Sequence, residues 1–196
     1  KVYDGNNSAT VLTRSLSGAI GGDVVSLTGG TATFSDKNVG TGKTVTLSGA
    51  SLTGANAGNY VLDSVSTTTA NITAITLTAT VAANNKPYDG NATATINSCS
   101  FSGVLGGDTV NCDTTGYSAS FNSKDVGPGK PVSASGLSKS GTDANNYTFD
   151  GTGTGSADIT AKTVTASVTA SNKPYDGNAN ATITGSATRT WARARL

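Results

Sequence analysis

The strongest constraint on the fold of this chain is a marker segment that occurs three times. Residues 86–96 read Lys-Pro-Tyr-Asp-Gly-Asn-Ala-Thr-Ala-Thr-Ile, residues 173–183 repeat them almost unchanged, and the chain opens with the shorter form Lys-Val-Tyr-Asp-Gly-Asn. The marker tyrosines Tyr3, Tyr88 and Tyr175 are 85 and 87 residues apart. A fixed period of this length is typical of a tandem array in which each repeat is a small domain.

Three further motifs recur in the same order between successive markers. They are Gly-Gly-Asp at 21–23 and 106–108, Phe-x-x-Lys-x-Val-Gly-x-Gly-Lys-x-Val at 34–45 and 121–132, and a segment ending in Asn-Tyr at 54–60 and 141–147. These matches set the expected boundaries. We expect a first repeat at residues 1–74 that lacks its opening strand, a complete repeat at 75–160, the start of a third, truncated repeat at 161–186, and an atypical tail at 187–196.

The composition favours strands over helices. All 12 acidic residues are Asp, and Gln, Met and His are absent, so most straight-chain helix formers are missing. Thr, Ser, Gly, Asn and Val dominate instead, which suits strands and tight turns. Only 35% of the residues are hydrophobic, but the apolar ones recur at matched positions, which a disordered segment has no reason to maintain. The predicted fold class is all-β, with tandem small β-sandwich repeats, Ig-like or grasp-like, in an elongated series.

Individual strands follow from the alternation of apolar and small polar residues. Residues 76–82 and 163–169 show this period-two pattern, and each would open a repeat. Further strands are expected at 9–17, 24–28 and 92–101. The segments that end in Tyr60 and Tyr147 predict a short helical turn or a tight loop whose tyrosine enters the core.

The two cysteines, Cys99 and Cys112, flank the second Gly-Gly-Asp loop. On the two arms of a hairpin they would face each other within reach of a disulfide. An oxidising compartment would favour that bond, and closing such a loop would stabilise the fold by about 3 kcal/mol. The alternative is a pair of buried free thiols. Arg14 and Leu27 occupy the equivalent positions of the first repeat, so the fold does not require the bridge.

The Tyr-Asp-Gly marker is interpreted as a structural motif. Its Asp would cap a turn, its Gly would adopt positive φ, and its Tyr would anchor the turn in the core. The alternative is calcium binding by the Asp oxygens, with Asp89 and Asp176 as the candidates. The residues assigned to the motif are Tyr3, Asp4, Gly5, Tyr88, Asp89, Gly90, Tyr175, Asp176 and Gly177.

Other chemistry finds little support in the sequence. Without His, nucleophilic catalysis lacks its usual base, and no Asp pair stands out, so we expect no enzyme, no catalytic residue and no cofactor other than the calcium alternative. Gly42-Lys43-Thr44 resembles part of a phosphate loop, but a strand rather than a helix follows it. With 13 basic and 12 acidic residues, no charge excess attracts nucleic acid. No apolar run approaches the length needed to span a membrane.

With these motifs in this order, residues 1 to about 186 resemble the tandem YDG-type, MBG-related domains of large bacterial surface and secreted proteins, including filamentous-haemagglutinin-like adhesins. The resemblance implies an exported all-β repeat at the bacterial cell surface or outside the cell, acting as a stalk or spacer whose partners are neighbouring repeats. It implies no catalytic site. The alternative is that the repeats bind a glycan or host protein through their end loops, for which an exposed aromatic such as Tyr117 would be the sign. The last ten residues depart from the family pattern.

The ends of the chain suggest one further partner. The first repeat lacks an opening strand, and residues 163–169 supply a spare one. We therefore expect head-to-tail self-association by strand addition. The sequence does not begin with Met, and we interpret it as a mature or excised piece of a longer protein.

Overall fold

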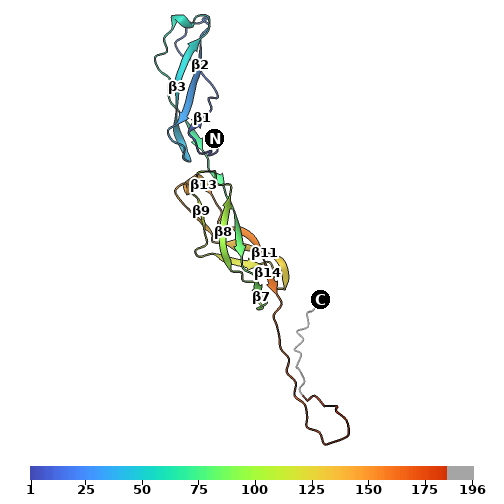
Figure 1. Ribbon diagram of the computed structural model, residues 1–196. Helices are drawn as coiled ribbons and strands as arrows, with labels where there is room; N and C mark the ends of the chain where they lie inside the picture. The colour runs from blue at the N-terminus through green and yellow to red at the C-terminus, as the bar shows by residue number, and fades with distance from the viewer. Residues whose placement is uncertain (185–196) are drawn as a thin grey trace. The chain divides into compact units, whose positions relative to one another are not determined.

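The computed structural model describes residues 1–184, and there the chain is all-β, with only two short 3-10 helices, η1 and η2, besides strands (Figure 1). The chain divides after Thr160. Residues 1–160 form one compact unit that contains both the first and the second repeat. No helix in residues 1–184 has the length and apolar character needed to cross a membrane.

The first repeat is built on a four-stranded antiparallel sheet in the order β1-β2-β3-β4. Its elements are β1 (Ser8–Ala9), β2 (Ser26–Phe34), β3 (Gly40–Thr53), η1 (Ala57–Asn59) and β4 (Thr68–Ile72). The long strands β2 and β3 lie side by side in Figure 1 and are joined by the turn after Phe34. Phe34, Val45 and Ile72 alternate with polar neighbours, so their side chains are buried on one face.

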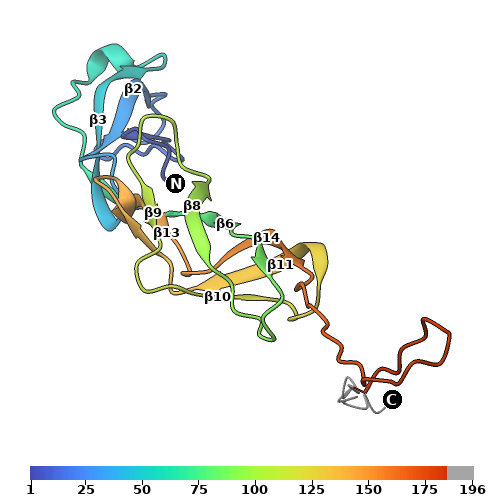
Figure 2. The same ribbon diagram turned by 60° about the horizontal axis from the view of Figure 1, so that its bottom comes forward.

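The second repeat has a larger sheet of six strands. The path is β10-β11-β14-β6-β8, with β7 also paired to β14, and two short pairs, β12-β9 and β13-β5, complete the repeat (Figure 2). The elements are β5 (Ile75–Thr76), β6 (Thr78–Ala83), β7 (Lys86–Pro87), β8 (Ile96–Ser102), β9 (Asn111–Asp113), β10 (Ser118–Phe121), β11 (Gly127–Ser135), β12 (Ser138–Ser140), η2 (Ala144–Asn146), β13 (Tyr147–Thr148) and β14 (Gly153–Thr160). The predicted opening strand at 76–82 is therefore confirmed, with an interruption at Leu77.

The two repeats share one pairing scheme. In the first, Gly40 pairs with Ile72 and Val45 with Thr68; in the second, Gly127 pairs with Ile159, and Val132 with Gly155. Both ladders contain an irregularity at the same place, just after the glycine. Strands β2, β3 and β4 thus correspond to β10, β11 and β14.

Two strand predictions are wrong. Residues 9–17 are extended but form a strand only at Ser8–Ala9, and residues 163–169 form none. The reason is the lack of a partner. The equivalent of 9–17 in the second repeat, β8, is held by six residue pairs with β6, which has no counterpart in the first repeat among residues 1–184. Smaller differences are that β2 begins at Ser26 and β8 at Ile96.

The cores follow from this arrangement. One cluster lies wholly in the second repeat, and its largest members include Val81, Phe121, Val132, Leu137 and Ile159. The other cluster combines Tyr3, Phe34, Val45 and Ile72 of the first repeat with Leu77 and Tyr147 of the second. The second cluster therefore spans the boundary between repeats.

The third repeat has only local structure where it is described. Residues 161–184 are exposed, with one isolated bridge between Ala170 and Ile183. The expected tail at 187–196 lies outside the described residues, as do the last two residues of the third repeat.

Candidate functional site at the joint between repeats

The marker segment folds into the same small loop in all three copies. Lys86 Nζ donates to Asp89 Oδ1 at 2.9 Å and to Asn91 Oδ1 at 3.0 Å. It also donates to the backbone carbonyls of Asn91 and Thr93. The Asn91 backbone N–H donates to Asp89 Oδ1 at 3.1 Å, and Gly90 has φ +86°. The carboxylate thus closes the turn, and the lysine holds it from the side.

The other two copies repeat these contacts. Lys1 Nζ is 2.7 Å from Asp4 Oδ1, and Lys173 Nζ is 2.7 Å from Asp176 Oδ1. Gly5 and Gly177 also have positive φ, at +80° and +74°. Because Lys173 keeps the arrangement where the third repeat has no core, the loop forms through local contacts alone.

The calcium candidates Asp89 and Asp176 lie in these loops. The oxygens that would coordinate a cation already surround the ammonium groups of Lys86 and Lys173. The described part of the chain contains no group of three or more His, Cys, Asp or Glu side chains placed to hold a metal ion. A calcium ion would have to displace the lysine.

The marker loop lies beside the phenylalanine motif in both repeats, but the marker tyrosines differ in burial. Lys1 Nζ lies 5.7 Å from the Phe34 ring centroid, and Lys86 Nζ lies 5.8 Å from that of Phe121, so marker and phenylalanine motif meet in both repeats. Tyr3 is 2% exposed, whereas Tyr175 is 98% exposed. Tyr88 is only half-buried. Full burial is therefore seen at Tyr3, on which the following repeat packs, and the prediction that the marker tyrosine is anchored in a core is wrong for Tyr175.

A continuous extended segment connects the first repeat to the second. After β4 ends at Ile72, Thr73 forms a parallel bridge with Val2, and Ile75 pairs with Tyr147 two residues later. The Tyr3 N–H donates to the Thr73 carbonyl at 2.8 Å. Backbone hydrogen bonds therefore hold this connection on both sides of the boundary, and it is not a loose linker.

Two tyrosines from different repeats meet at this boundary. The rings of Tyr3 and Tyr147 pack edge to face, with centroids 5.7 Å apart. The Tyr147 hydroxyl donates to Asp108 Oδ2 at 2.7 Å and accepts from the Leu105 N–H at 3.0 Å. The Tyr3 hydroxyl is buried without a hydrogen-bond partner among the described residues.

Burial changes the ionisation of both phenols. It raises the pKa of Tyr147 to about 12, with the Asp108 carboxylate adding to the effect. The pKa of Tyr3 is also raised, first by burial and then by Asp108. Both groups stay neutral across the physiological range, as a packed aromatic contact requires.

Polar contacts surround the tyrosine pair. Asn146, the one buried polar residue of the described chain, accepts from the Val39 N–H at 2.9 Å and donates to Asn38 Oδ1 at 3.3 Å. Lys37 Nζ lies 3.7 Å from Asp108 and 3.9 Å from Asp143. The phenylalanine motif of the first repeat thus contacts the Gly-Gly-Asp and Asn-Tyr motifs of the second. We call these residues, with Tyr3 and Tyr147, the joint.

The second repeat contributes Tyr147 and Asp108 to the joint, and the first repeat contains the equivalent pair, Tyr60 and Asp23. The Tyr60 hydroxyl donates to Asp23 Oδ2 at 2.6 Å and accepts from the Ile20 N–H at 3.0 Å. Ile20 is 71% exposed there, whereas its equivalent Leu105 is half-buried in the joint. Conversely, Val126 of the second repeat is 53% exposed, whereas its equivalent Val39 is half-buried. Each repeat therefore presents both halves of one joint.

The predicted disulfide between Cys99 and Cys112 is confirmed, with Cα atoms 5.7 Å apart. Its setting differs from the expected hairpin. Cys99 lies on β8 of the large sheet, but β9 pairs with β12, and Cys112 faces Lys139. The bridge thus links two sheets, which the sequence could not indicate because β12 is remote from both cysteines.

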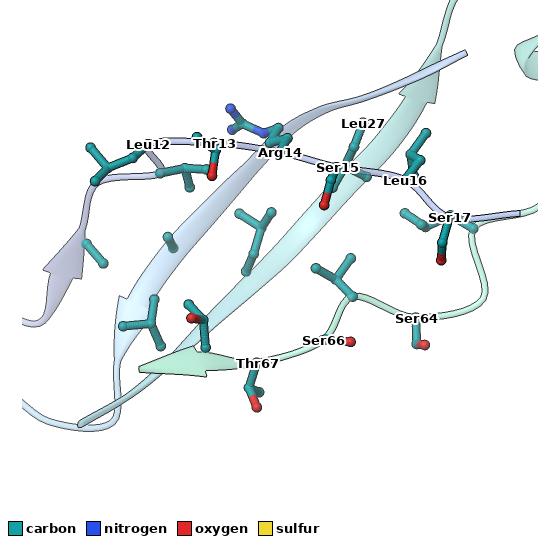
Figure 3. Close-up of a pocket in the computed structure, with 18 of the residues that line it drawn as sticks. Leu12, Thr13, Arg14, Ser15, Leu16, Ser17, Leu27, Ser64, Ser66 and Thr67 are labelled. Carbon is teal, nitrogen blue, oxygen red and sulfur yellow. The ribbon is translucent and has the colours of Figure 1, made fainter. Parts of the chain in front are cut away.

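A groove lies on the first repeat (Figure 3). It encloses about 1180 Å³ between the extended segment 9–17 and the segment 60–70, with β2 and β3 as its floor. Apolar side chains from the floor, such as Leu27, Val45 and Leu47, face the groove, and Ser and Thr residues line its rims.

Sequence reasoning identified the marker residues but not the joint. Lys37, Asn146 and Tyr147 all lie in motifs that recur between repeats, and that recurrence was the available signal. Internal repetition does not reveal whether a motif packs within its own repeat or against the next one, so their roles could not be assigned.

The structure shows an all-β chain in which two consecutive copies of one sequence motif set are connected by an extended segment, held by backbone hydrogen bonds on both sides. The family model described as YDG domain matches residues 1–71 and 68–155, and the chain belongs to this family. The two matches overlap within β4, the strand that leads into the joint. Neither the curated proteins nor the solved structures gave a match to the chain.

Proposed function

We propose that this chain is a structural spacer, a stalk segment of a bacterial extracellular repeat adhesin, built from tandem small β-sandwich modules. The observation that carries the proposal is the joint. The most distinctive residues of the repeat, including Tyr3, Asp108 and Tyr147, serve contacts between modules. A repeat whose recurring motifs form the contacts with neighbouring repeats is suited to keep those neighbours in a fixed arrangement and to transmit force along an array.

Two features support the extracellular assignment. The Cys99–Cys112 disulfide is a bond that persists in oxidising compartments. The repeats contain few charged residues and have short polar turns, as we expect of a module that is exposed to solvent and serves only as a spacer. We propose that the marker loops bind no calcium, because the Asp carboxylates are paired with lysines such as Lys86.

The experiment that tests the spacer proposal is the insertion of a second copy of residues 75–160 directly after Thr160. The inserted repeat would then meet the second one through Tyr88 and Lys124, the equivalents of Tyr3 and Lys37. Small-angle scattering should show a larger maximum dimension for the protein with the inserted repeat than for the original protein. A longer chain with an unchanged maximum dimension would contradict a spacer.

The alternative function, binding of a glycan or host protein by end loops, loses its main sequence argument. Tyr117 is half-buried, and its hydroxyl accepts from the Ile96 N–H at 2.8 Å, so it packs on the core of its own repeat. Glycan-array binding by the full chain, abolished by substitutions in the exposed end loops, would favour this alternative over the spacer.

A further inference from the structure

The Cys99–Cys112 disulfide encloses a loop that the second repeat contributes to the joint. The two cysteines are 13 residues apart in the sequence, and the loop of residues 103–109 lies between them. This loop carries Leu105 and Asp108, which both hydrogen-bond to the buried tyrosine of the second repeat. The bridge therefore joins the two strands, β8 and β9, between which this part of the joint extends.

The same loop also contacts the first repeat directly. Leu105 packs against the cluster that contains Tyr3, and a Cβ on Gly5 would lie only 3.8 Å from Leu105 Cδ1. Asp108 Oδ1 lies 3.7 Å from Lys37 Nζ of the first repeat. A displacement of the loop would therefore move groups that touch both repeats.

The loop belongs to a part of the second repeat that is separate from the large sheet. β9 pairs with β12 in a two-stranded sheet of its own, through three residue pairs. The Thr109 N–H donates to Asp143 Oδ2 at 3.0 Å, which ties the loop to the start of η2. Lys139 of β12 donates to the Ala144 carbonyl at 2.7 Å. Because Cys99 lies on β8 of the six-stranded sheet, the disulfide attaches this whole part covalently to the large sheet.

The first repeat shows which features of the loop need no bridge. Its equivalent loop has Arg14 and Leu27 where the cysteines would be. It nevertheless keeps the hydrogen bonds of the Tyr60 hydroxyl to Asp23 and to the Ile20 N–H. The local shape of the loop therefore does not require the disulfide. The distinct contribution of the bridge is to fix the loop relative to the large sheet, and the position of the joint depends on that attachment.

We propose that the Cys99–Cys112 disulfide is a redox-sensitive restraint on the joint. In the oxidised chain it holds the loop 103–109 in contact with the first repeat. In the reduced chain the loop and β9 move relative to the large sheet, and the joint loosens. This control depends only on the joint, so it holds whether the array acts as a spacer or presents a binding surface.

The reaction that releases the restraint is thiol–disulfide exchange with a dithiol. A thiolate of the dithiol attacks one of the two sulfurs, forms a mixed disulfide and releases the other cysteine as a thiolate. The second thiolate of the dithiol then displaces the remaining cysteine. Two electrons and two protons pass from the dithiol to the two cysteines, and the dithiol becomes a cyclic disulfide. Both cysteines are half-buried rather than enclosed, so a small dithiol can reach them.

Amide hydrogen exchange, measured residue by residue by NMR on the full chain, tests the restraint. The informative amide is that of Val39, because its N–H donates across the joint to Asn146 Oδ1 at 2.9 Å. Reduction with dithiothreitol should make this amide exchange about tenfold faster or more. Since the disulfide lies in the second repeat, an effect on an amide of the first repeat reports on the joint itself.

Two other amides serve as controls in the same spectra. The Ala94 N–H donates to the Ala119 carbonyl at 3.0 Å inside the second repeat. The Phe34 N–H donates to the Asn7 carbonyl at 2.7 Å inside the first repeat. The exchange of both should change far less than that of Val39, because neither hydrogen bond crosses the joint.

A variant without cysteines separates the loss of the bridge from other effects of the reductant. Cys99→Ser with Cys112→Ser should show the fast exchange at Val39 both with and without dithiothreitol. Two results would overturn the proposal. One is an exchange rate at Val39 that stays the same after complete reduction, as verified by mass spectrometry. The other is equal acceleration at Val39 and Ala94, which would show that the bridge stabilises the second repeat as a whole and does not act on the joint.

Discussion

At the scale of single residues, the marker lysine is the part of the motif whose role is clearest. Lys86 collects five acceptor contacts from three residues while its side chain is 17% exposed. With this many oxygen partners, the ammonium group takes the position in the turn that a bound cation would otherwise have. It explains why the marker combines Lys, Asp and Asn at fixed spacing without requiring a metal.

We predict that Lys86→Met lowers the melting temperature of the second repeat by roughly 4 °C or more, as followed by circular dichroism. Lys173→Met, in the exposed third copy, should leave the melting temperature unchanged.

The pKa of Asp89 is lowered from its ordinary 3.8, first by the Lys86 hydrogen bond and then by the Asn91 N–H. Its stabilisation is therefore present at neutral pH and is lost as pH falls below 3.8, and Lys86→Met should reduce that acid-dependent loss. If Lys86→Met and the unsubstituted protein lose the same stability as pH falls below 3.8, the role given to the lysine is contradicted.

A second prediction at this scale concerns Tyr147. Its pKa is raised from 10.0 to about 12, so its contribution to stability is complete below pH 10 and disappears as pH rises through 12. Ultraviolet absorbance should show a phenol that ionises only as pH rises toward 12. Tyr147→Phe should reduce the absorbance change of this late ionisation by one phenol, while Tyr3, whose pKa is also raised, still ionises late. If the Tyr147 phenol ionises near its ordinary pKa of 10.0 instead, the joint is not buried as described.

At the scale of elements, the sequence predicted the recurring parts well and the pairing poorly. The motif matches identified equivalent strands and a short helical turn or tight loop before Tyr147, and the positions of the two cysteines beside one loop indicated the Cys99–Cys112 bond. They failed at residues 9–17 and 163–169, because alternation of apolar residues shows only that a segment can be a strand. Whether it becomes one depends on a partner, and β6 has no counterpart beside residues 9–17.

The joint was beyond prediction for a related reason. Lys37 and Asp108 come from different repeats, and each has an equivalent in the other repeat, Lys124 and Asp23. Nothing in one sequence distinguishes a contact within a repeat from one between repeats. Only the positions of the strands make that choice.

We predict that Gly155→Ala destabilises the second repeat by about 3 kcal/mol, since its Cβ would overlap the Val81 carbonyl and push β6 away. Ser156→Ala is the control, because Ser156 is exposed on the same strand. Chemical denaturation of the oxidised protein would measure both changes. Equal stabilities would show that β6 does not pack against β14 at this point.

At the scale of the whole molecule, the account depends on the joint being a fixed contact. The covalent connection through Thr73 is held by backbone hydrogen bonds on both sides, and Tyr3, Asn146 and Lys37 close around it. Lys37 is partly exposed, so its ion pairs contribute little alone. The buried Tyr147 and Asn146 carry most of the specificity.

The most direct test is the distribution of distances between spin labels on Ser51→Cys and Ser133→Cys, one in each repeat, in the oxidised full chain. The joint predicts one narrow distribution, which Asn146→Ala with Tyr147→Ala should broaden. The matched pair Asn59→Ala with Tyr60→Ala, at the equivalent positions of the first repeat, should leave the distribution narrow. A distribution that is already broad in the unsubstituted protein would contradict the central claim that neighbouring repeats are rigidly joined.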